Sequence, residues 1–283
     1  DFGIRVFGPG KEAAPIEWSK SFAKRLMMDC GIPTAPAEIF DDFNAALEHA
    51  DVCELPIVIK ADGLALGKGV KIAYDRAQAR QIVLEFMGER ALGDAGKIVL
   101  FEQMLQGREV SVFAFCNGTQ MALPLVSACD YKQAYEGGPN TGGMGSYSPA
   151  EFWDEALASE VRIRIIQPIL NALANAGTPF EGMLYVGLMI TQDGLQVIEF
   201  NARFGDPEAQ VILPRLKTPL SKVIEATIDG QLANLYLQWS DEVCVAVVVA
   251  SQGYPGPPEV NFPISGLTQL DEGILVFLGG VRQ

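Results

Sequence analysis

The segment that most constrains the fold is a pair of apolar runs separated by Asp193-Gly194. The runs read GMLYVGLMITQ and LQVIEFN, and Asp-Gly between two apolar runs is a strong signal for a β-hairpin. Helical spacing appears elsewhere, as in EALASEVRIRIIQPILNALANAG, where we expect Pro168 to disturb a long helix. Strands and helices mix without strict βαβ alternation, which predicts an α+β fold built from lobes.

Several shorter stretches carry local signals for the remaining elements. The apolar spacing in SKSFAKRLMMDCG predicts a helix, which Ser19 can begin and Gly31 can end. The run LPIVIKAD predicts a buried strand that ends at Lys60, and KIVLFEQML and REVSVFAFCNG predict two strands joined by a short turn. A further β element begins in DEVCVAVVVASQGYPGPP, where we expect a new subdomain to start.

Composition disfavours several classes of protein. The chain has 283 residues, of which 49% are hydrophobic, and this is enough for a sizeable core. Its net charge of -14 repels phosphate backbones, so we expect no nucleic-acid partner. No apolar run reaches membrane-spanning length and no signal peptide is visible, so we expect no membrane partner and a cytoplasmic location.

The cysteines and the single histidine narrow the chemistry further. The 5 cysteines are scattered without a C-x-x-C pair, which argues against a disulfide framework or a zinc ribbon. His49 lies in DDFNAALEHADVCE, which has the pattern of an amphipathic surface helix, so we expect no catalytic role for it. Ser-His-Asp catalysis and multi-histidine metal sites are therefore disfavoured.

A glycine-rich stretch, KADGLALGKGV, follows the strand predicted to end at Lys60. It places Lys68 between Gly67 and Gly69. Backbone N–H groups in such a turn are able to cradle phosphate oxygens while lysines neutralise their charge. The spacing is not that of a Walker A loop. A tight surface hairpin with a solvated lysine is the alternative.

Two further stretches place acids and amides at strand ends. In FEQMLQGREVS, Glu102 and Glu109 flank a turn, where the backbone could meet an adenine edge and Glu109 a ribose; an ordinary hairpin is the alternative. In VIEFNARFGDPE, Glu199 and Asn201 share one face of a strand and present oxygens suited to Mg²⁺. Arg203 would share that face if the strand continues, and could meet a phosphate or a carboxylate. An exposed strand end is the alternative.

The stretch GPNTGGMGSYSP packs 4 glycines and 2 prolines into 12 residues. It predicts neither helix nor strand, because glycine and proline interrupt both. It also lacks the composition of a loose linker. We interpret it as an ordered loop that bears hydroxyl groups, with a purely structural Ω-loop as the alternative to a binding role.

Together these stretches resemble the ATP-grasp superfamily and, more closely, the glycinamide ribonucleotide synthetase family. The resemblance runs over nearly the whole chain, through SKSFAK, VIKADGLALGKGV, GGPNTGGMGSYSP, GMLYVGLMIT and VIEFNARFGDPEAQV. It implies that ATP phosphorylates glycine and that the amine of 5-phosphoribosylamine attacks the acyl phosphate. The partners implied are ATP, glycine and 5-phosphoribosylamine, with Mg²⁺ or Mn²⁺ as cofactor; the oligomeric state stays open, with a monomer as one option.

The resemblance also implies roles for particular residues. Glu199 and Asn201 match metal ligands, and Lys60 and Arg203 match catalytic residues. Residues matched to the ATP site are Lys20, Lys60, Gly67, Lys68, Gly69, Glu102, Gln103, Met104, Leu105 and Glu109. Residues matched to the substrate site are Asp130, Lys132, Asn140, Thr141, Gly142, Gly143, Met144, Gly145, Asp206 and Pro207. Many ATP-grasp enzymes carry another metal-binding carboxylate where this chain has Gly187.

The implied domains are a large ATP-grasp lobe at 1–55 and 116–230, a small lid lobe at 56–115 and a partial, β-rich C-terminal domain at 231–283. The chain does not begin with Met, and we expect an N-terminal domain to be absent from it. It departs from the family pattern at Asp130-Tyr131-Lys132-Gln133, where the family usually has Asp-His-Lys-Arg. The alternatives are another ATP-grasp carboxylate–amine ligase, or an ATP-binding fragment without activity.

Overall fold

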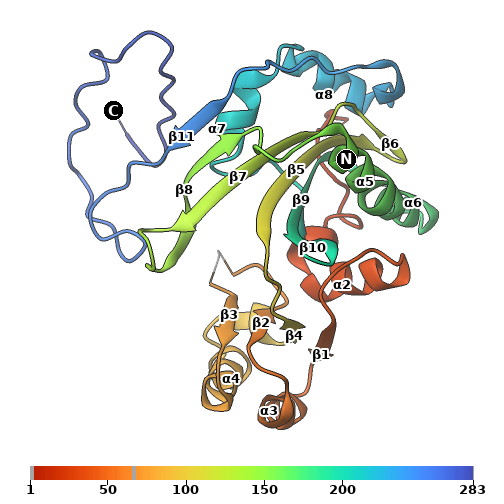
Figure 1. Cartoon of the computed structure of the whole chain (residues 1–283), viewed down its shortest axis with the longest axis vertical. Helices are drawn as coiled ribbons and strands as arrows, with labels where there is room; N and C mark the ends of the chain where they lie inside the picture. The colour runs from red at the N-terminus through yellow and green to blue at the C-terminus, as the bar shows by residue number, and fades with distance from the viewer. Residues whose placement is uncertain (1–2, 66–67, 283) are drawn as a thin grey trace.

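Two antiparallel sheets of unequal size organise the described part of the chain (Figure 1). The structure is a computed structural model that describes residues 3–65 and 68–282. Within these residues the smaller sheet has 4 strands in the order β1-β4-β2-β3. They are β1 (Ala37–Phe40), β2 (Ile57–Ala61), β3 (Val70–Ala73) and β4 (Val99–Gln103).

The larger sheet has the order β10-β9-β5-β7-β8-β11, with β6 paired to β5. Its strands are β5 (Arg108–Asn117), β6 (Gln120–Met121), β7 (Val126–Gln133), β8 (Asn140–Ser148), β9 (Glu181–Thr191), β10 (Gly194–Asn201) and β11 (Cys244–Val247). As predicted, β9 and β10 form a hairpin in which Gly194 pairs with Thr191. This pairing confirms the Asp-Gly turn signal.

Helices pack on both sheets. The α-helices are α1 (Pro15–Trp18), α2 (Lys20–Asp29), α3 (Phe43–Val52), α4 (Arg76–Val83), α5 (Glu155–Val161), α6 (Gln167–Asn175), α7 (Ala209–Ile212) and α8 (Leu220–Ile228). The segments of π- or 3₁₀-helix are η1 (Leu84–Gly88), η2 (Gly93–Gly96), η3 (Arg162–Ile166), η4 (Leu213–Arg215) and η5 (Leu232–Asn234). None of the described helices is long and apolar enough to cross a membrane.

Two helix predictions are confirmed in detail. The Ser19 hydroxyl accepts a hydrogen bond from the Phe22 N–H and caps α2, and Gly31 follows the helix with φ +65°. The long helix is interrupted as expected, because the π-helical segment η3 separates α5 from α6 just before Pro168. A proline ring clashes with the carbonyl four residues earlier, and a wider turn relieves that clash.

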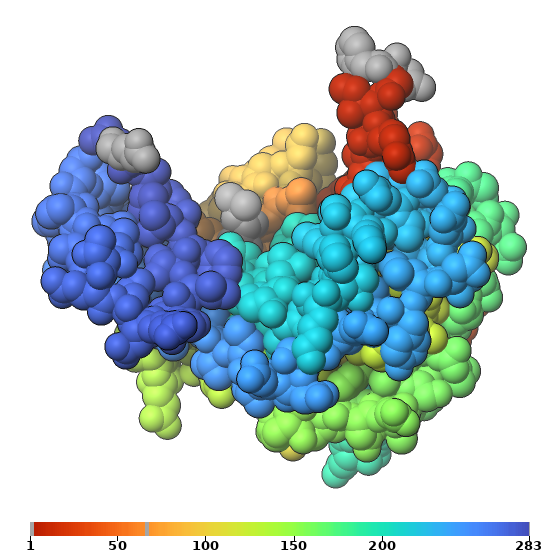
Figure 2. Space-filling model, turned by 90° about the horizontal axis from the view of Figure 1, so that it is seen from above, coloured from red at the N-terminus to blue at the C-terminus, as the bar shows by residue number. Residues whose placement is uncertain are grey.

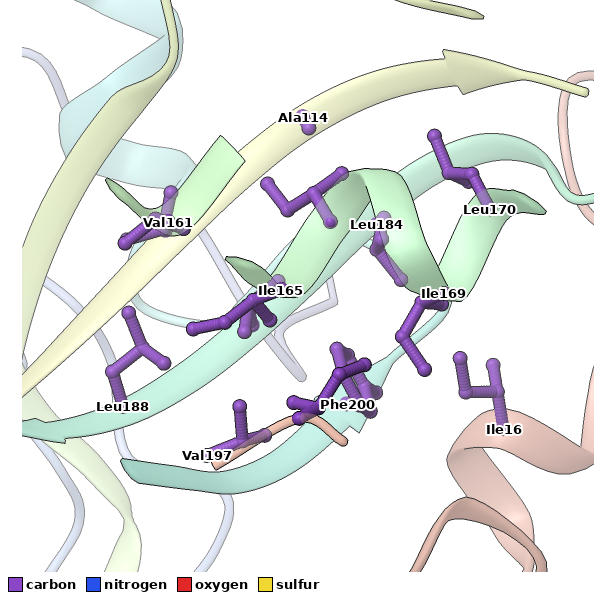
Figure 3. Packing of buried hydrophobic residues seen from close by; sticks show 14 of the residues in the cluster. Ile16, Ala114, Val161, Ile165, Ile169, Leu170, Leu184, Leu188, Val197 and Phe200 are labelled. Carbon is purple, nitrogen blue, oxygen red and sulfur yellow. The ribbon is translucent and has the colours of Figure 1, made fainter. Parts of the chain in front are cut away.

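The main core lies between one face of the large sheet and the α5-η3-α6 helix (Figure 3). Leu184 and Leu188 of β9 and Phe200 of β10 pack against Ile165 and Ile169, and all five side chains are buried. A separate cluster covers the other face of the sheet beneath α7 and α8, and a third fills the small lobe beneath α3 and α4. Each sheet therefore has its own core, which leaves the junction between them for polar groups.

The prediction of a glycine-rich loop at 138–149 is wrong for most of that stretch. Residues Asn140–Ser148 form β8, which lies between β7 and β11. Gly143 has φ +134°, and a Cβ there would lie 2.3 Å from Cδ of Pro207. A Cβ at Gly145 would lie 2.7 Å from the Ala246 carbonyl oxygen. The glycines therefore allow close packing within a strand, which a propensity argument reads as a break.

Other expectations about organisation also change. The strands predicted from KIVLFEQML and REVSVFAFCNG are present as β4 and β5 with a short connection, as expected, but they do not form a hairpin, since β4 belongs to the small sheet and β5 to the large one. The small sheet includes Ala37–Phe40, which lies before the expected segment 56–115, and it ends at Gln103. We therefore propose 37–103 as the extent of the small lobe.

The C-terminal β element that was expected to begin a new subdomain pairs with the large sheet, and the partial domain at 231–283 stays a prediction. β11 is an edge strand of the large sheet, because its Cys244 and Val245 pair with Ser148 and Tyr147 of β8. After β11, residues 248–282 contain no helix or strand and almost all are exposed. In Figure 2 this segment, drawn in dark blue, protrudes from the side of the molecule.

Candidate nucleotide site between the two sheets

A buried cluster of three charges lies where the small sheet meets α2. Glu102 on β4 is bracketed by two lysines: Lys60 Nζ on β2 lies 2.8 Å from Oε2, and Lys24 Nζ on α2 lies 3.4 Å from Oε1. All three side chains are buried. Lys60 also donates to the Ile198 carbonyl of β10, at 3.3 Å. The contacts of this cluster thus cross from one sheet to the other.

The N-terminus of α2 is tied to the small lobe by Asp62. One Asp62 oxygen accepts from the Ser21 N–H at 2.5 Å, and the Ser19 hydroxyl lies 3.1 Å from the other. Lys20 begins α2, and its Nζ donates to the Gly63 carbonyl at 3.3 Å. Burial lowers the pKa of Lys20, and Lys60 lowers it further, whereas Glu199 and Asp62 oppose the shift. Lys20 and Lys60, from different lobes, therefore face the same region.

The end of β10 carries the predicted polar residues on one side. Asn201 Nδ2 donates to Glu199 Oε1 at 3.3 Å, and Arg203 Nη2 donates to Asn201 Oδ1 at 3.4 Å. Glu17 holds this turn, since its Oε1 accepts from Arg203 Nε at 2.8 Å and its Oε2 from the Ala202 N–H at 2.9 Å. Glu199, Asn201 and Arg203 are therefore brought together.

The ligand set at β10 fits a metal ion only in part. Gly187 of β9 is the register partner of Glu199, so the neighbouring strand offers no carboxylate there. The described residues contain no group of three or more His, Cys, Asp and Glu side chains that could hold a metal ion. Two hard oxygen ligands suit a Mg²⁺ ion that takes its other ligands from nucleotide phosphates and water.

A small cavity adjoins Glu199 on the face of the large sheet. Its lining residues are Glu109, Val110, Ser111, Lys132, Tyr185, Gly187, Leu188, Ile198 and Glu199. Lys132 Nζ lies 3.0 Å from Glu109 Oε2 and 3.9 Å from Asp130 Oδ2. Burial raises the pKa of Asp130 to about 6, although Lys132 opposes the shift. Burial acts to lower the pKa of Lys132, but Asp130 and Glu109 outweigh it and leave that pKa above its ordinary value.

A buried hydrogen-bonded network lies behind this cavity. The Tyr185 hydroxyl lies 2.7 Å from Ser111 Oγ and 2.8 Å from Glu208 Oε1. Burial and then the nearby Glu208 carboxylate raise the pKa of Tyr185. The phenol therefore stays neutral and links the cavity to the loop that follows β10.

The expected substrate residues gather around β8 and that loop. Asp206 and Pro207 lie against Gly143, and the Ser146 hydroxyl donates to the Pro207 carbonyl at 2.8 Å. Gly142 donates its N–H to the Tyr254 hydroxyl at 3.0 Å, and Thr141 Oγ1 donates to the Lys132 carbonyl at 2.8 Å. Asn140, Gly142 and Thr141 begin the strand, while Met144 and Gly145 continue it.

The remaining expected residues lie in the connections between strands. Gly67 lies outside the described residues. Lys68 is exposed, and Gly69 is buried with its carbonyl accepting from the Ala61 N–H at 2.7 Å. Met104 and Leu105 follow Gln103 in the connection from β4 to β5, so the expected adenine-binding segment joins the two sheets.

Sequence reasoning missed several residues at this junction. Lys24 could have been noticed as a lysine four residues after Lys20, on the apolar face of α2. Asp62 follows the lysine-bearing strand directly. Glu17 and Tyr185 carried no comparable signal, because their roles depend on long-range contacts.

Comparison with known proteins matches residues 18–209 to a family model described as the phosphoribosylglycinamide synthetase, ATP-grasp (A) domain. The chain is 46% identical over 279 residues to a phosphoribosylamine–glycine ligase of Caldanaerobacter subterraneus subsp. tengcongensis, covering 98% of this chain and 67% of the relative. It is 46% identical to the enzyme of that name from Halalkalibacterium halodurans, covering 99% of this chain and 65% of the relative. The chain thus spans about two thirds of the length of these curated relatives.

Solved structures give the same picture of the fold. A crystal structure of phosphoribosylamine–glycine ligase from Thermotoga maritima is similar with a TM-score of 0.81 and 34% identity, over 93% of this chain and 67% of that one. A crystal structure described as a biotin carboxylase-beta-gamma-ATP complex, from Campylobacter jejuni, has a TM-score of 0.65 at 18% identity, over 90% of this chain and 56% of that one. At that identity the likeness shows only the shared ATP-grasp fold.

Proposed function

The chain belongs to the phosphoribosylglycinamide synthetase family, as its ATP-grasp domain shows, and from this premise we propose that it acts as a phosphoribosylamine–glycine ligase. The reaction joins glycine to 5-phosphoribosylamine and converts ATP to ADP and phosphate. The observation that carries the proposal is the convergence of Lys20, Lys60 and Glu199 at the junction of the two sheets. Lys20 on α2 and Lys60 on β2 supply positive charge for the phosphates, and Glu199 on β10 supplies an oxygen ligand for Mg²⁺. This combination suits the binding of Mg·ATP.

Chemistry of this kind depends on positioning and charge neutralisation rather than on a protein nucleophile. Lys20 and Lys60 would bind the phosphates, and the connection after β4 would bind the adenine. Glu199 and Asn201 would hold Mg²⁺, which when bound neutralises charge on the phosphate oxygens. Arg203, fixed by Glu17, would orient the reacting carboxylate or phosphoryl group.

The proposed reaction has two chemical steps. A glycine carboxylate oxygen attacks the γ-phosphorus, and the bond from that phosphorus to the ADP oxygen breaks. The amine of 5-phosphoribosylamine then attacks the acyl carbon, loses a proton and expels phosphate. Asp130, the residues of β8, and Asp206 lie on the side of the site where we place glycine and the acceptor amine.

An assay of ADP release against a panel of amines tests this proposal. The full-length protein would be given Mg·ATP, glycine and, in turn, 5-phosphoribosylamine, aminoimidazole ribonucleotide, ammonia or an amino acid. We expect rapid ADP release with 5-phosphoribosylamine alone among these acceptors. Preference for another amine would assign a different carboxylate–amine ligase, and ATP binding without turnover on any amine would reduce the chain to a nucleotide-binding protein.

A further inference from the structure

Lys24 is a buried lysine with no assigned role in the proposed reaction. It is 1% exposed, and its Nζ has three acceptors, namely Thr34 Oγ1 at 2.7 Å, the Ala35 carbonyl at 3.0 Å and Glu102 Oε1 at 3.4 Å. The Thr34 hydroxyl donates a hydrogen bond to the Val197 carbonyl, so its oxygen accepts the hydrogen bond from Lys24. Burial lowers the pKa of Lys24 and the Glu102 carboxylate opposes that shift, while the three acceptors match the three N–H donors of an ammonium group.

The Glu102 carboxylate pairs with two lysines, one at each of its oxygens. Its Oε1 faces Lys24 and its Oε2 faces Lys60, with all three side chains buried. The cluster therefore carries one net positive charge in an environment that screens charge poorly. Without Lys24, the Lys60–Glu102 pair would have no net charge, and the positive charge of Lys60 would be neutralised by Glu102 alone.

We propose that Lys24 is a positioning residue for nucleotide binding: by holding one oxygen of Glu102 it leaves the charge of Lys60 available to a polyphosphate. This inference rests on the proposed ATP site. Lys24 does not touch the nucleotide in this scheme. It acts through Glu102, which lies on β4, whereas Lys24 itself lies on α2.

Binding of two ligands to the full-length protein distinguishes this role from a purely structural one. ATP carries the phosphates and adenosine does not, so loss of available charge at Lys60 weakens only the binding of ATP. We expect Lys24→Met to lower ATP affinity about tenfold and to leave adenosine affinity unchanged. Equal losses for both ligands, or no loss for ATP, would overturn the inference. If the wild-type protein binds no ATP, the proposed function itself has failed.

Two further variants make the test robust. Lys24→Gln keeps hydrogen-bonding capacity towards Thr34 and Ala35, and it replaces the methionine variant if that protein does not fold. Lys71→Met is the matched control, because Lys71 pairs with Glu85 at 2.6 Å within the small lobe and not with Glu102, and ATP affinity should not change.

A double variant tests whether Lys24 acts through Glu102. In a Glu102→Gln background the carboxylate that Lys24 neutralises is gone, so adding Lys24→Met should have little further effect on ATP affinity. Equal effects of Lys24→Met in the two backgrounds would show that Lys24 acts independently of Glu102 and would contradict the inference.

Discussion

Single residues set the charge balance at the junction of the two sheets. Glu199 and Asn201 supply oxygen ligands, Lys20 and Lys60 supply cations, and Asp130 is an acid whose burial disfavours its charged form. Such groups contribute little to packing, so their concentration at one place favours a functional role.

Glu199→Gln tests the proposed metal ligand. The substitution keeps size and shape but removes the charge that would help fix Mg²⁺ on the phosphates. We expect kcat to fall by roughly 10²-fold or more, about 2.7 kcal/mol, with the fold intact. The measurement is steady-state turnover with circular dichroism as a check of folding. Glu48→Gln, on the exposed side of α3, is the control. Near-normal turnover by folded Glu199→Gln would refute the metal-ligand role.

Asp130→Asn tests the buried acid through pH. The pKa of Asp130 is raised from 3.8 to about 6 in the folded protein, so the folded state binds more protons than the unfolded state between these values. The free energy of unfolding of the wild type should therefore fall as pH rises through this window, by up to about 3 kcal/mol. Asn does not titrate, so the stability advantage of the variant should grow from pH 4 to pH 7. Urea denaturation at several pH values measures it, and a constant difference would contradict the shift.

Elements of secondary structure show where sequence patterns suffice and where they fail. The β9–β10 hairpin and the capped helix α2 were predictable, because Asp-Gly turns and Ser caps act locally. β8 was not predictable, because its glycines are required by close contacts with Pro207 and Ala246, which are distant in the sequence. Local propensity does not include such contacts. Glu17 was missed for the same reason, since its partner Arg203 lies far along the chain.

Gly143→Ala tests the account of β8. A Cβ at this position would lie 2.3 Å from Cδ of Pro207 in a backbone conformation with φ +134°. We expect a loss of about 3 kcal/mol or more in the free energy of unfolding, measured by urea denaturation. Gly142→Ala in the same strand is the control, because its nearest atom is the end of the Tyr254 side chain at 3.3 Å. Equal stabilities of the two variants would show that the close contact with Pro207 is not required.

At the scale of the whole molecule, two separately packed lobes meet through polar contacts. Each sheet has its own core. The junction is held by Asp62, which accepts a hydrogen bond from the start of α2, and by Glu102, which lies between its two lysines. The division into two lobes followed from the family resemblance, which also led us to expect the nucleotide between them. The extent of the small lobe did not follow from it, because β1 precedes α3 and joins its sheet only through pairing with β4.

Hydrogen exchange tests the nucleotide position between the lobes. Ligand binding to the native state stabilises it, and closure of the small lobe should protect the backbone over the phosphates. We expect Mg·ATP to raise the melting temperature and to slow exchange in peptides spanning residues 61–70 and 102–109. Peptides from α8, on the far side of the large sheet, serve as the internal control. Unchanged exchange at 61–70 with saturating Mg·ATP would rule out the small lobe as a lid.

The most direct test of the proposed reaction follows the oxygen atoms of glycine. If ATP phosphorylates the glycine carboxylate and the amine then expels phosphate, one carboxylate oxygen leaves with the phosphorus. The full-length protein would be given Mg·ATP, 5-phosphoribosylamine and glycine labelled with ¹⁸O in its carboxylate, and the inorganic phosphate analysed by mass spectrometry. The account predicts one ¹⁸O atom in each phosphate released with product. Product formation with unlabelled phosphate would contradict it.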